Sequence, residues 1–573
     1  MKKKEQLPEF DTSLLTEFTF GDPEAKTDEM LLHCFQKVRG VQEFLTGTKS
    51  IVLGERGAGK SALFKLVADG VLTFGKDDKH NTAIIPIDED LEYLAIANII
   101  EERFSDQTQR KHGKYRYLWE LYILSRIIDR LNDDNPGDLE IATLRDDFGA
   151  VLGLSKKPGF RLRDLFTAYK ITVGSKIDSS GSITPSVSVE PVTQQNSTKQ
   201  SVTDHEISEL RARLKKVLRA KKTVAIVLID RVDDFLVGNA YEEQLKNIQA
   251  LVDCIKDFRL PEMKLKVFLR TDLFRRINFA HGGYDKLAPQ IAQLEWSSKD
   301  ICEFVARRLI HNYVRLDIHI PYNTDLSLLD VDPSLAEQLR ELFKSKRNGI
   351  REFCKGICDV AILKTKIKWA KIKRTSHSAR KTDLLHALII RIITHIFPHK
   401  LTHYNIHCQK EEISFEAYLA SHFKLGADTP NPRLALLFLS FTFEDAAYYY
   451  SRNPDKSIIQ ANDLHEYELI LKENIISGYS KLQETVRKTV AHLSPEHQKY
   501  VERLFLSLKS PNESSNLTLN RLKDLTEWDL SENDFHGFVK LFTHIGLLVT
   551  NNPEVQFEKR TFTLPLAMQT CQN

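Results

Sequence analysis

The 573-residue sequence lacks any run of about 18 consecutive apolar residues, the length that a helix needs to cross a bilayer. The basic start MKKKEQLPEF resembles the beginning of a secretory signal, but no apolar core follows it. The longest apolar run, near Leu384–Ile393, is interrupted by His386 and Arg391 and is typical of a buried helix. We therefore expect a cytoplasmic protein without a membrane partner.

Cysteine is scarce, and strong net charge is lacking. The seven cysteines are odd in number, widely spread and without a CxxC pair, which excludes a disulfide framework and indicates a reduced compartment. Cys354 and Cys358 lie four apart, but two further zinc ligands at zinc spacing are missing. A net charge of +3 by itself predicts neither a nucleic acid nor an acidic substrate as a partner.

One motif does carry chemistry. Residues 54–61, GERGAGKS, match the phosphate-loop pattern GxxxxGK[ST], between a strand expected at Ser50–Leu53 and a helix expected at Ser61–Ala68. Glycines let successive main-chain N–H groups turn around phosphate oxygens, where a Cβ would clash. Lys60 should act catalytically at the β- and γ-phosphates of ATP, and the Ser61 hydroxyl should ligate Mg²⁺. The predicted nucleotide contacts are Gly54, Glu55, Arg56, Gly57, Ala58, Gly59, Lys60, Ser61, Ala62 and Arg270.

A magnesium site of this kind needs a carboxylate from the end of a neighbouring buried strand. The apolar run Thr223–Ile229 (TVAIVLI) is followed by Asp230, Asp233 and Asp234. We expect Asp230 to hold Mg²⁺ directly or through water, and Asp233 or Asp234 to orient the attacking water. The choice between the two later acids is open. The alternative is a loop of solvated acids.

Another apolar run, Lys266–Leu269, ends in Arg270-Thr271-Asp272. Ligands in open α/β sheets bind at the carboxyl ends of the strands, so one of these three residues could sense the γ-phosphate. Equally, Asp272 could only cap the short helix that follows.

Alternating strands and helices predict an α/β P-loop core with a parallel sheet, followed by helical domains and a C-terminal winged helix. Within the core, a Ser- and Thr-rich segment at 174–202 predicts either a β-hairpin or a flexible insertion. A helical pattern from Met30 to Val41 predicts one leader helix before the P-loop. The expected domains are a leader region (1–47), the ATPase core (48–296), a helical lid (297–365), a helical domain (366–490) and a winged-helix-like domain (491–573).

The order of these motifs resembles a known group. GERGAGKS, then an apolar strand ending in DRVDD, then FLRTD and a helical lid are similar to the STAND and origin-recognition-like ATPases, which are related to AAA+ proteins. The spacing of the acids is similar to that of NACHT and KAP domains. The leader FGDPEAKTDEMLLHCF, Trp296 and Asn431-Pro432-Arg433 resemble a bacterial family of P-loop ATPases found in mobile or antiviral loci.

The resemblance implies ATP rather than GTP and a lid that moves with the nucleotide state. It also implies homo-oligomers in which an arginine of one subunit completes the site of the next. The candidate arginines are Arg275, Arg276, Arg307 and Arg308, and the alternative is that they are helix-surface charges.

Two segments bear on nucleic acid as a partner. The most basic stretch places eight cations around Trp369, which suits a phosphate backbone and a stacked base, although a solvated helix face explains it as well. These cations are Lys364, Lys366, Lys368, Lys371, Lys373, Arg374, Arg380 and Lys381. In the winged-helix segment, basic residues are diluted by acids, so DNA binding there is the weaker alternative.

Together these features predict an ATP-binding, slowly hydrolysing switch that oligomerises or engages a separate effector protein, with antiviral defence as the setting implied by the resemblance. The rival hypothesis is a DNA-binding ATPase similar to replication initiators or transposition regulators. A third is a scaffold that binds ATP without hydrolysing it.

Overall fold

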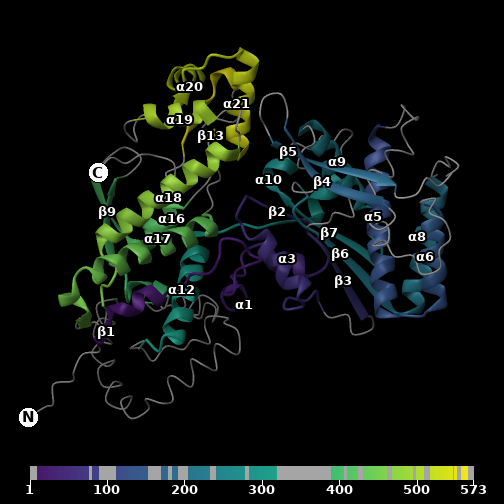
Figure 1. Ribbon diagram of the computed structural model, residues 1–573, viewed down its shortest axis with the longest axis horizontal. Coiled ribbons are helices and arrows are strands. Elements are labelled where there is room, and N and C mark those ends of the chain that lie inside the picture. Colours follow the sequence, from purple (N-terminus) through teal and green to yellow (C-terminus); the bar gives the residue numbers. More distant parts are fainter. Residues whose placement is uncertain are drawn as a thin grey trace, which may run out of the picture. The chain divides into compact units, whose positions relative to one another are not determined.

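The chain forms two compact units in the computed structural model (Figure 1): residues 39–294, and residues 1–38 together with 295–573. The structure describes residues 9–75, 81–88, 111–151, 169–177, 183–191, 204–232, 241–275, 277, 283–318, 389–390, 392–404, 410–423, 430–460, 467–493, 498–508, 516–545, 548–550 and 556–564.

A five-stranded parallel sheet organises the unit 39–294, in the order β3-β6-β7-β2-β8. Its strands are β2 (Ile51–Gly54), β3 (Asn81–Ile87), β6 (Thr223–Ile229), β7 (Met263–Arg270) and β8 (Ile291–Gln293). The inner strands β2, β6 and β7 are almost wholly buried, as expected for a parallel sheet covered on both faces. The predicted α/β core is thereby confirmed.

Helices cover both faces of this sheet. Side chains alternate between the faces of a strand, so Phe268 lies on one face, where Phe64 of α3 (Lys60–Ala68) and Phe44 of α2 (Val41–Leu45) pack against its ring. Odd-numbered residues such as Val227 and Val267 lie on the other face, in one core cluster with α5, α8 and α9. These helices span Lys111–Asp134, Asp204–Ala220 and Tyr241–Cys254.

The connection from β3 to β6 is long. It contains α5, α6 (Leu139–Val151), a hairpin of β4 (Tyr169–Ile177) and β5 (Ile183–Pro191), and α8. Helices α5, α6 and α8 pack on one another beside the sheet (Figure 1). The unit also contains α10 (Thr271–Phe274), α11 (Gly283–Leu287) and η3 (Ala288–Gln290). The sequence did not lead us to expect β8.

The prediction of one leader helix is wrong. The chain forms two short helices, α1 (Leu31–Cys34) and α2, separated by extended backbone at Phe35 and a left-handed Gly40. Gly40 has a φ of +91°, and a Cβ there would lie 2.1 Å from the carbonyl oxygen of Gln293. A conformation that only glycine adopts freely therefore interrupts the apolar periodicity.

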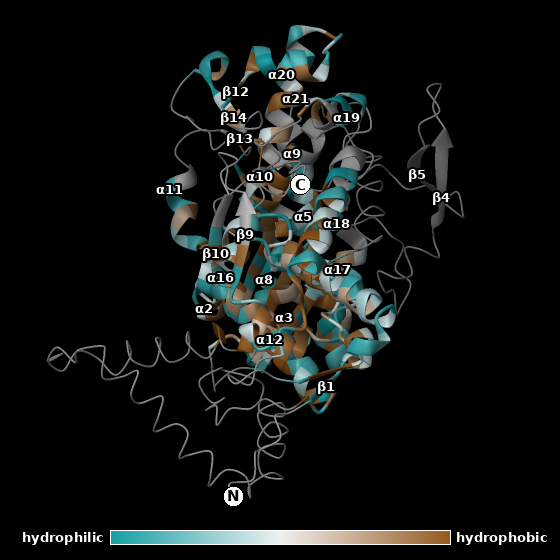
Figure 2. Ribbon diagram, turned by 90° about the vertical axis from the view of Figure 1, so that its left-hand side faces the viewer, coloured by the Kyte–Doolittle hydropathy of each residue, from teal (hydrophilic) through white to brown (hydrophobic). Residues whose placement is uncertain are grey.

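Helices dominate the other unit. Its α12 (Ser298–Arg315) begins with a capping box formed by Ser297 and Asp300, and α17 (Pro432–Ser451) begins with an Asn431 cap and a proline in the first turn. Figure 2 shows both hydrophobic and hydrophilic residues on these helices. The remaining elements are α16 (Phe415–His422), α18 (Lys472–Leu493), β1 (Glu9–Asp11), η1 (Thr12–Glu17), β9 (Lys400–Tyr404), β10 (Lys410–Ser414), η5 (Pro454–Lys456) and β11 (Ile458–Gln460).

The leader segment is tied into this helical unit. Strand β1 pairs antiparallel with β11. The guanidinium of Arg308 on α12 donates to Asp28 at 2.6 and 3.0 Å and to the carbonyl of Phe20 at 2.7 Å, and both charged side chains are buried. Removal of either partner would leave a buried charge without compensation, so this pair fixes the leader on α12.

The C-terminal residues form a winged helix, as predicted. Helices α19 (Gln498–Ser507), α20 (Leu519–Thr526) and α21 (Glu532–Ile545) precede an antiparallel hairpin of β13 (Val549–Thr550) and β14 (Thr561–Thr563), and β12 (Leu517–Thr518) adds a third strand. A short η8 (Phe557–Lys559) lies between β13 and β14. Tyr500, Trp528 and Phe538 pack together in the core of this module.

Candidate functional site

The loop at 54–61 connects the buried strand β2 to the start of α3. Gly57 and Gly59 have φ values of +82° and +93°, which a residue with a Cβ rarely adopts. Within the described part of the chain, their amides donate to no other group. The first amides of α3 also have no partner within the helix, so donors and the positive end of the helix dipole converge on this turn. The loop therefore has the geometry of an anion cradle.

Lys60 lies inside this cradle. Its ammonium donates to the carbonyl oxygens of Gly54 and Glu55, each at 3.0 Å, and the residue is only 8% exposed. A Cβ at Gly54 would lie 3.2 Å from the Cβ of Ala58 and 3.4 Å from the Cγ of Lys60. The glycine thus leaves room for the lysine side chain to pass back over the end of β2.

Asp230 meets Ser61 across the strand ends. It follows β6, and by strand alternation it falls on the face that α3 covers. The Ser61 hydroxyl lies close enough to this carboxylate to lower its pKa. Burial raises the pKa of Asp230, against the opposing influence of the Ser61 hydroxyl and the Lys60 charge. Within the described residues the Oδ2 atom has no hydrogen-bond partner although it is buried.

This donor set fits a magnesium ion. Mg²⁺ prefers oxygen ligands and is commonly held by one or two carboxylates, water and substrate phosphates. The unpartnered Oδ2 of Asp230 and the adjacent hydroxyl of Ser61 are ligands of this kind, next to the anion cradle. The described residues contain no group of three or more His, Cys, Asp or Glu side chains that would hold a metal by themselves.

The strand that carries Asp230 is not the immediate neighbour of β2, contrary to the sequence-based expectation. Strand β7 lies between them, pairing Val267 with Ile51 on one side and with Ile229 on the other. Helix α3 packs on β3 and β7 as well as on β2, so Ser61 at its start comes within reach of Asp230. A single sequence indicates strands but not their order in the sheet.

The end of β7 places a further hydroxyl near this edge. Arg270 is aligned with Gly54 in the sheet. Thr271 follows it, is 4% exposed, and its Oγ1 is buried without a hydrogen-bond partner among the described residues. Asp272 lies inside α10, whose N-cap residue is Arg270.

The structure describes only some of the other predicted residues. Asp233, Asp234 and Arg276 are outside the described residues, as is the basic stretch at 364–381. Arg275 is exposed.

Arg307 and Arg308 are not surface charges. Arg307 donates to Glu303 and Gln36 and is 4% exposed. Arg308 pairs with Asp28. Neither arginine is available to complete the site of a second subunit without breaking buried bonds.

No protein-family model matches the chain, and no curated protein matches it. Among solved structures, the chain is similar to the ORC2 protein of Aeropyrum pernix in ADPNP–ADP complexes, with 9% identity, a TM-score of 0.34, and coverage of 95% of this chain and 94% of that one. It is also similar to the Aeropyrum pernix ORC1 protein in complex with DNA, with 10% identity, a TM-score of 0.31 and coverage of 94% of each chain. At these values the likeness adds nothing to what the strand order and loop geometry show by themselves.

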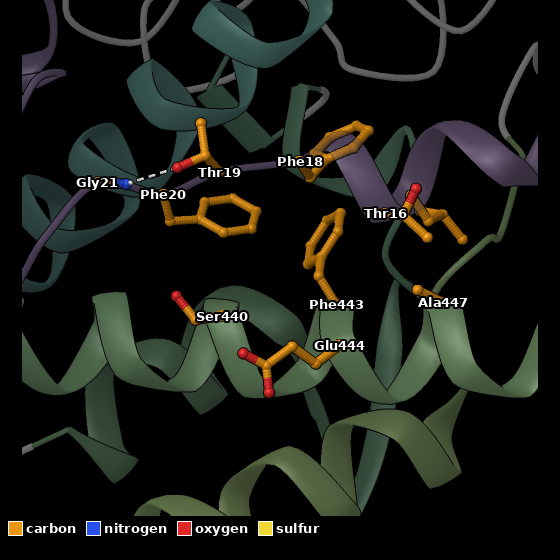
Figure 3. A pocket seen from close by; sticks show the side chains of 10 residues that line it. Thr16, Phe18, Thr19, Phe20, Gly21, Ser440, Phe443, Glu444 and Ala447 are labelled. Carbon is orange, nitrogen blue, oxygen red and sulfur yellow. Dashed lines mark hydrogen bonds between the residues drawn. The ribbon is translucent and has the colours of Figure 1, made fainter.

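A separate pocket of about 450 Å³ opens in the helical unit, between the leader and α17 (Figure 3). The rings of Phe18, Phe20 and Phe443 pack together there, with Ser440 and Glu444 on the side of α17. None of the predicted site residues lines it. Among the described helices, none is long and apolar enough to traverse a lipid bilayer.

Proposed function

We propose that the protein is an ATP-binding and slowly ATP-hydrolysing molecular switch. The observation that carries the proposal is the contact between Asp230 and Ser61 beside the Lys60 cradle, because a carboxylate, a hydroxyl and a lysine in this arrangement suit a Mg²⁺-bound triphosphate. A buried carboxylate with an unpartnered oxygen costs folding free energy, and a bound cation would offset that cost.

Each residue has a distinct role in this proposal. The amides of Gly57, Gly59 and the first turn of α3 bind the phosphate oxygens, and the Lys60 ammonium moves from the loop carbonyls to the β- and γ-phosphates. Ser61 and Asp230 would hold Mg²⁺, which would neutralise charge on the β- and γ-phosphates. Arg270 and Thr271 contact the γ-phosphate from the end of β7. Asp233 or Asp234 orients the attacking water.

Hydrolysis in this site is a transfer to water. The bond between the γ-phosphorus and the bridging oxygen breaks, ADP leaves with the electron pair, and the water oxygen bonds to phosphorus while a proton passes to the orienting carboxylate and then to solvent. The resemblance favours a cycle in which ATP drives self-assembly or engagement of an effector protein and hydrolysis resets it. Antiviral defence stays a prediction from the resemblance.

Replacement of Lys60 tests the proposal. In Lys60→Ala, the loss of charge-assisted hydrogen bonds should weaken ATP binding by about 10- to 100-fold and abolish phosphate release. Lys65→Ala is the matched control, because Lys65 lies on the same helix α3 and faces Asp69 at 4.0 Å on the surface. Titration calorimetry and a phosphate-release assay give the two readouts. Equal ATP affinity in folded Lys60→Ala and Lys65→Ala proteins would refute the assignment.

DNA binding through the winged helix is the weaker hypothesis. Two of its basic side chains pair with acids of the same module. Lys499 pairs with Asp529, and Lys523 pairs with Glu532. Such pairs reduce the positive potential that a phosphate backbone would meet.

A further inference from the structure

Arg231, which follows Asp230 directly, has an unusual backbone conformation. Its φ is +55°, in the left-handed region that residues with a Cβ occupy only at a cost in free energy. Strained residues of this kind persist where the surrounding structure uses them, and they cluster at functional sites. Either the turn or the arginine side chain must therefore account for the left-handed backbone at position 231.

The turn by itself does not require an arginine at position 231. In a continuing strand, residue 231 would share a face with Ile229, on the core side covered by α5 and α9. The left-handed conformation instead allows Val232 to enter that core, where it is 1% exposed. A glycine would make the same turn without strain, so the turn requires no side chain at position 231.

Arg231 lies at a strand end from which its side chain can reach the loop at 54–61. Strands β6, β7 and β2 are consecutive in the sheet, so Arg231, Arg270 and the Lys60 loop follow neighbouring carboxyl ends. Two strand spacings amount to about 10 Å, and the shorter side chain of Asp230 already contacts Ser61 from the same strand end.

We propose that Arg231 binds the γ-phosphate of ATP from within the same chain. This proposal rests on the proposed function. A guanidinium presents two parallel donors that match two phosphate oxygens, so Arg231 distinguishes ATP from ADP, which lacks that phosphate. As the γ-phosphoryl group passes from ADP to water, the same two donors stabilise the charge on its oxygens.

The test compares nucleotide preference in two glycine variants. Arg231→Gly removes the guanidinium and keeps the turn. Lys222→Gly is the matched control, because Lys222 is also basic and left-handed, with a φ of +49°, but it is exposed and precedes β6 at the opposite end of the strand. Calorimetry with Mg²⁺ measures the affinities for ADPNP and ADP, and thermal unfolding without nucleotide measures stability.

Both variants should unfold close to the wild-type temperature, since the relief of left-handed strain offsets the greater freedom of glycine in the unfolded chain. Only Arg231→Gly should lose preference for ADPNP over ADP, by about 10- to 100-fold, and Arg231→Lys should recover part of it. A wild-type preference in Arg231→Gly overturns the role of Arg231 and leaves the proposed function standing. Absence of nucleotide binding in the wild type overturns both.

Discussion

At the scale of single residues, the candidate site contains charged and strained residues that the fold alone does not require. Asp230 is buried with one oxygen unpartnered, Lys60 is buried against carbonyls, and Arg231 has a strained backbone. Each feature costs folding free energy, and all three lie at neighbouring strand ends. A bound triphosphate with Mg²⁺ would compensate these charges together, which a purely structural role does not explain.

Lys266 is a buried charge of a different kind. It lies on β7, and its ammonium donates to the carbonyls of Gly47, at 2.6 Å, and Lys49. Burial lowers its pKa to about 7. The unfolded chain holds the proton up to a pKa near 10.5, so the penalty of the buried charge is complete below pH 7 and disappears as the pH rises towards 10.5.

We therefore predict that the wild type gains stability relative to Lys266→Met as the pH is raised from 7 to 9.5. Methionine has a similar volume and does not titrate, so the variant isolates this one proton. Urea unfolding of both proteins at the two pH values measures the difference in free energy. A difference that stays constant with pH would show that Lys266 keeps its ordinary pKa in the folded protein.

At the scale of elements, close contact between α17 and α18 fixes the helical unit. Gly478 of α18 faces Thr442 of α17, and a Cβ at Gly478 would lie 2.3 Å from its Oγ1 and 2.9 Å from its Cα. The helices can approach this closely only because position 478 has no side chain. In α21 the corresponding space at Gly537 is open, because no atom lies within 4 Å of the point that a Cβ would occupy.

The same substitution should have opposite effects at these two glycines. Gly478→Ala is expected to destabilise the protein by about 1–3 kcal/mol through overpacking. Gly537→Ala should stabilise α21 by up to about 1 kcal/mol, since alanine favours a helix interior over glycine. Thermal unfolding followed by circular dichroism measures both. A Gly478→Ala protein as stable as Gly537→Ala would contradict the packing of α17 on α18.

At the scale of the whole molecule, the sequence predicted elements with local signals and missed arrangements that depend on tertiary contacts. Strand Thr223–Ile229 has the predicted bounds, because a continuous apolar run is a local signal. The insertion of β7 between β2 and β6, and the break at Gly40, depend on distant segments. The burial of Arg308 likewise requires Asp28, which lies 280 residues away in the chain.

In the candidate site, too, some residues have local sequence signals and others are recognised only in three dimensions. The loop residues and Asp230 were predictable, since their motifs are contiguous. Thr271 was named only within a tripeptide, and its buried, unpartnered hydroxyl is visible only in three dimensions. Arg231 gave no sequence signal, because an arginine after a strand is ordinary until its φ is known.

The most direct test of the account is a double-mutant cycle between Ser61 and Asp230, read as the gain in ATP affinity when Mg²⁺ is added. If both residues hold one ion, Ser61→Ala and Asp230→Asn should each remove most of the gain, and the double variant should lose little more than either single variant. Full additivity of the two losses, or a wild-type affinity that does not respond to Mg²⁺, would contradict the shared metal site.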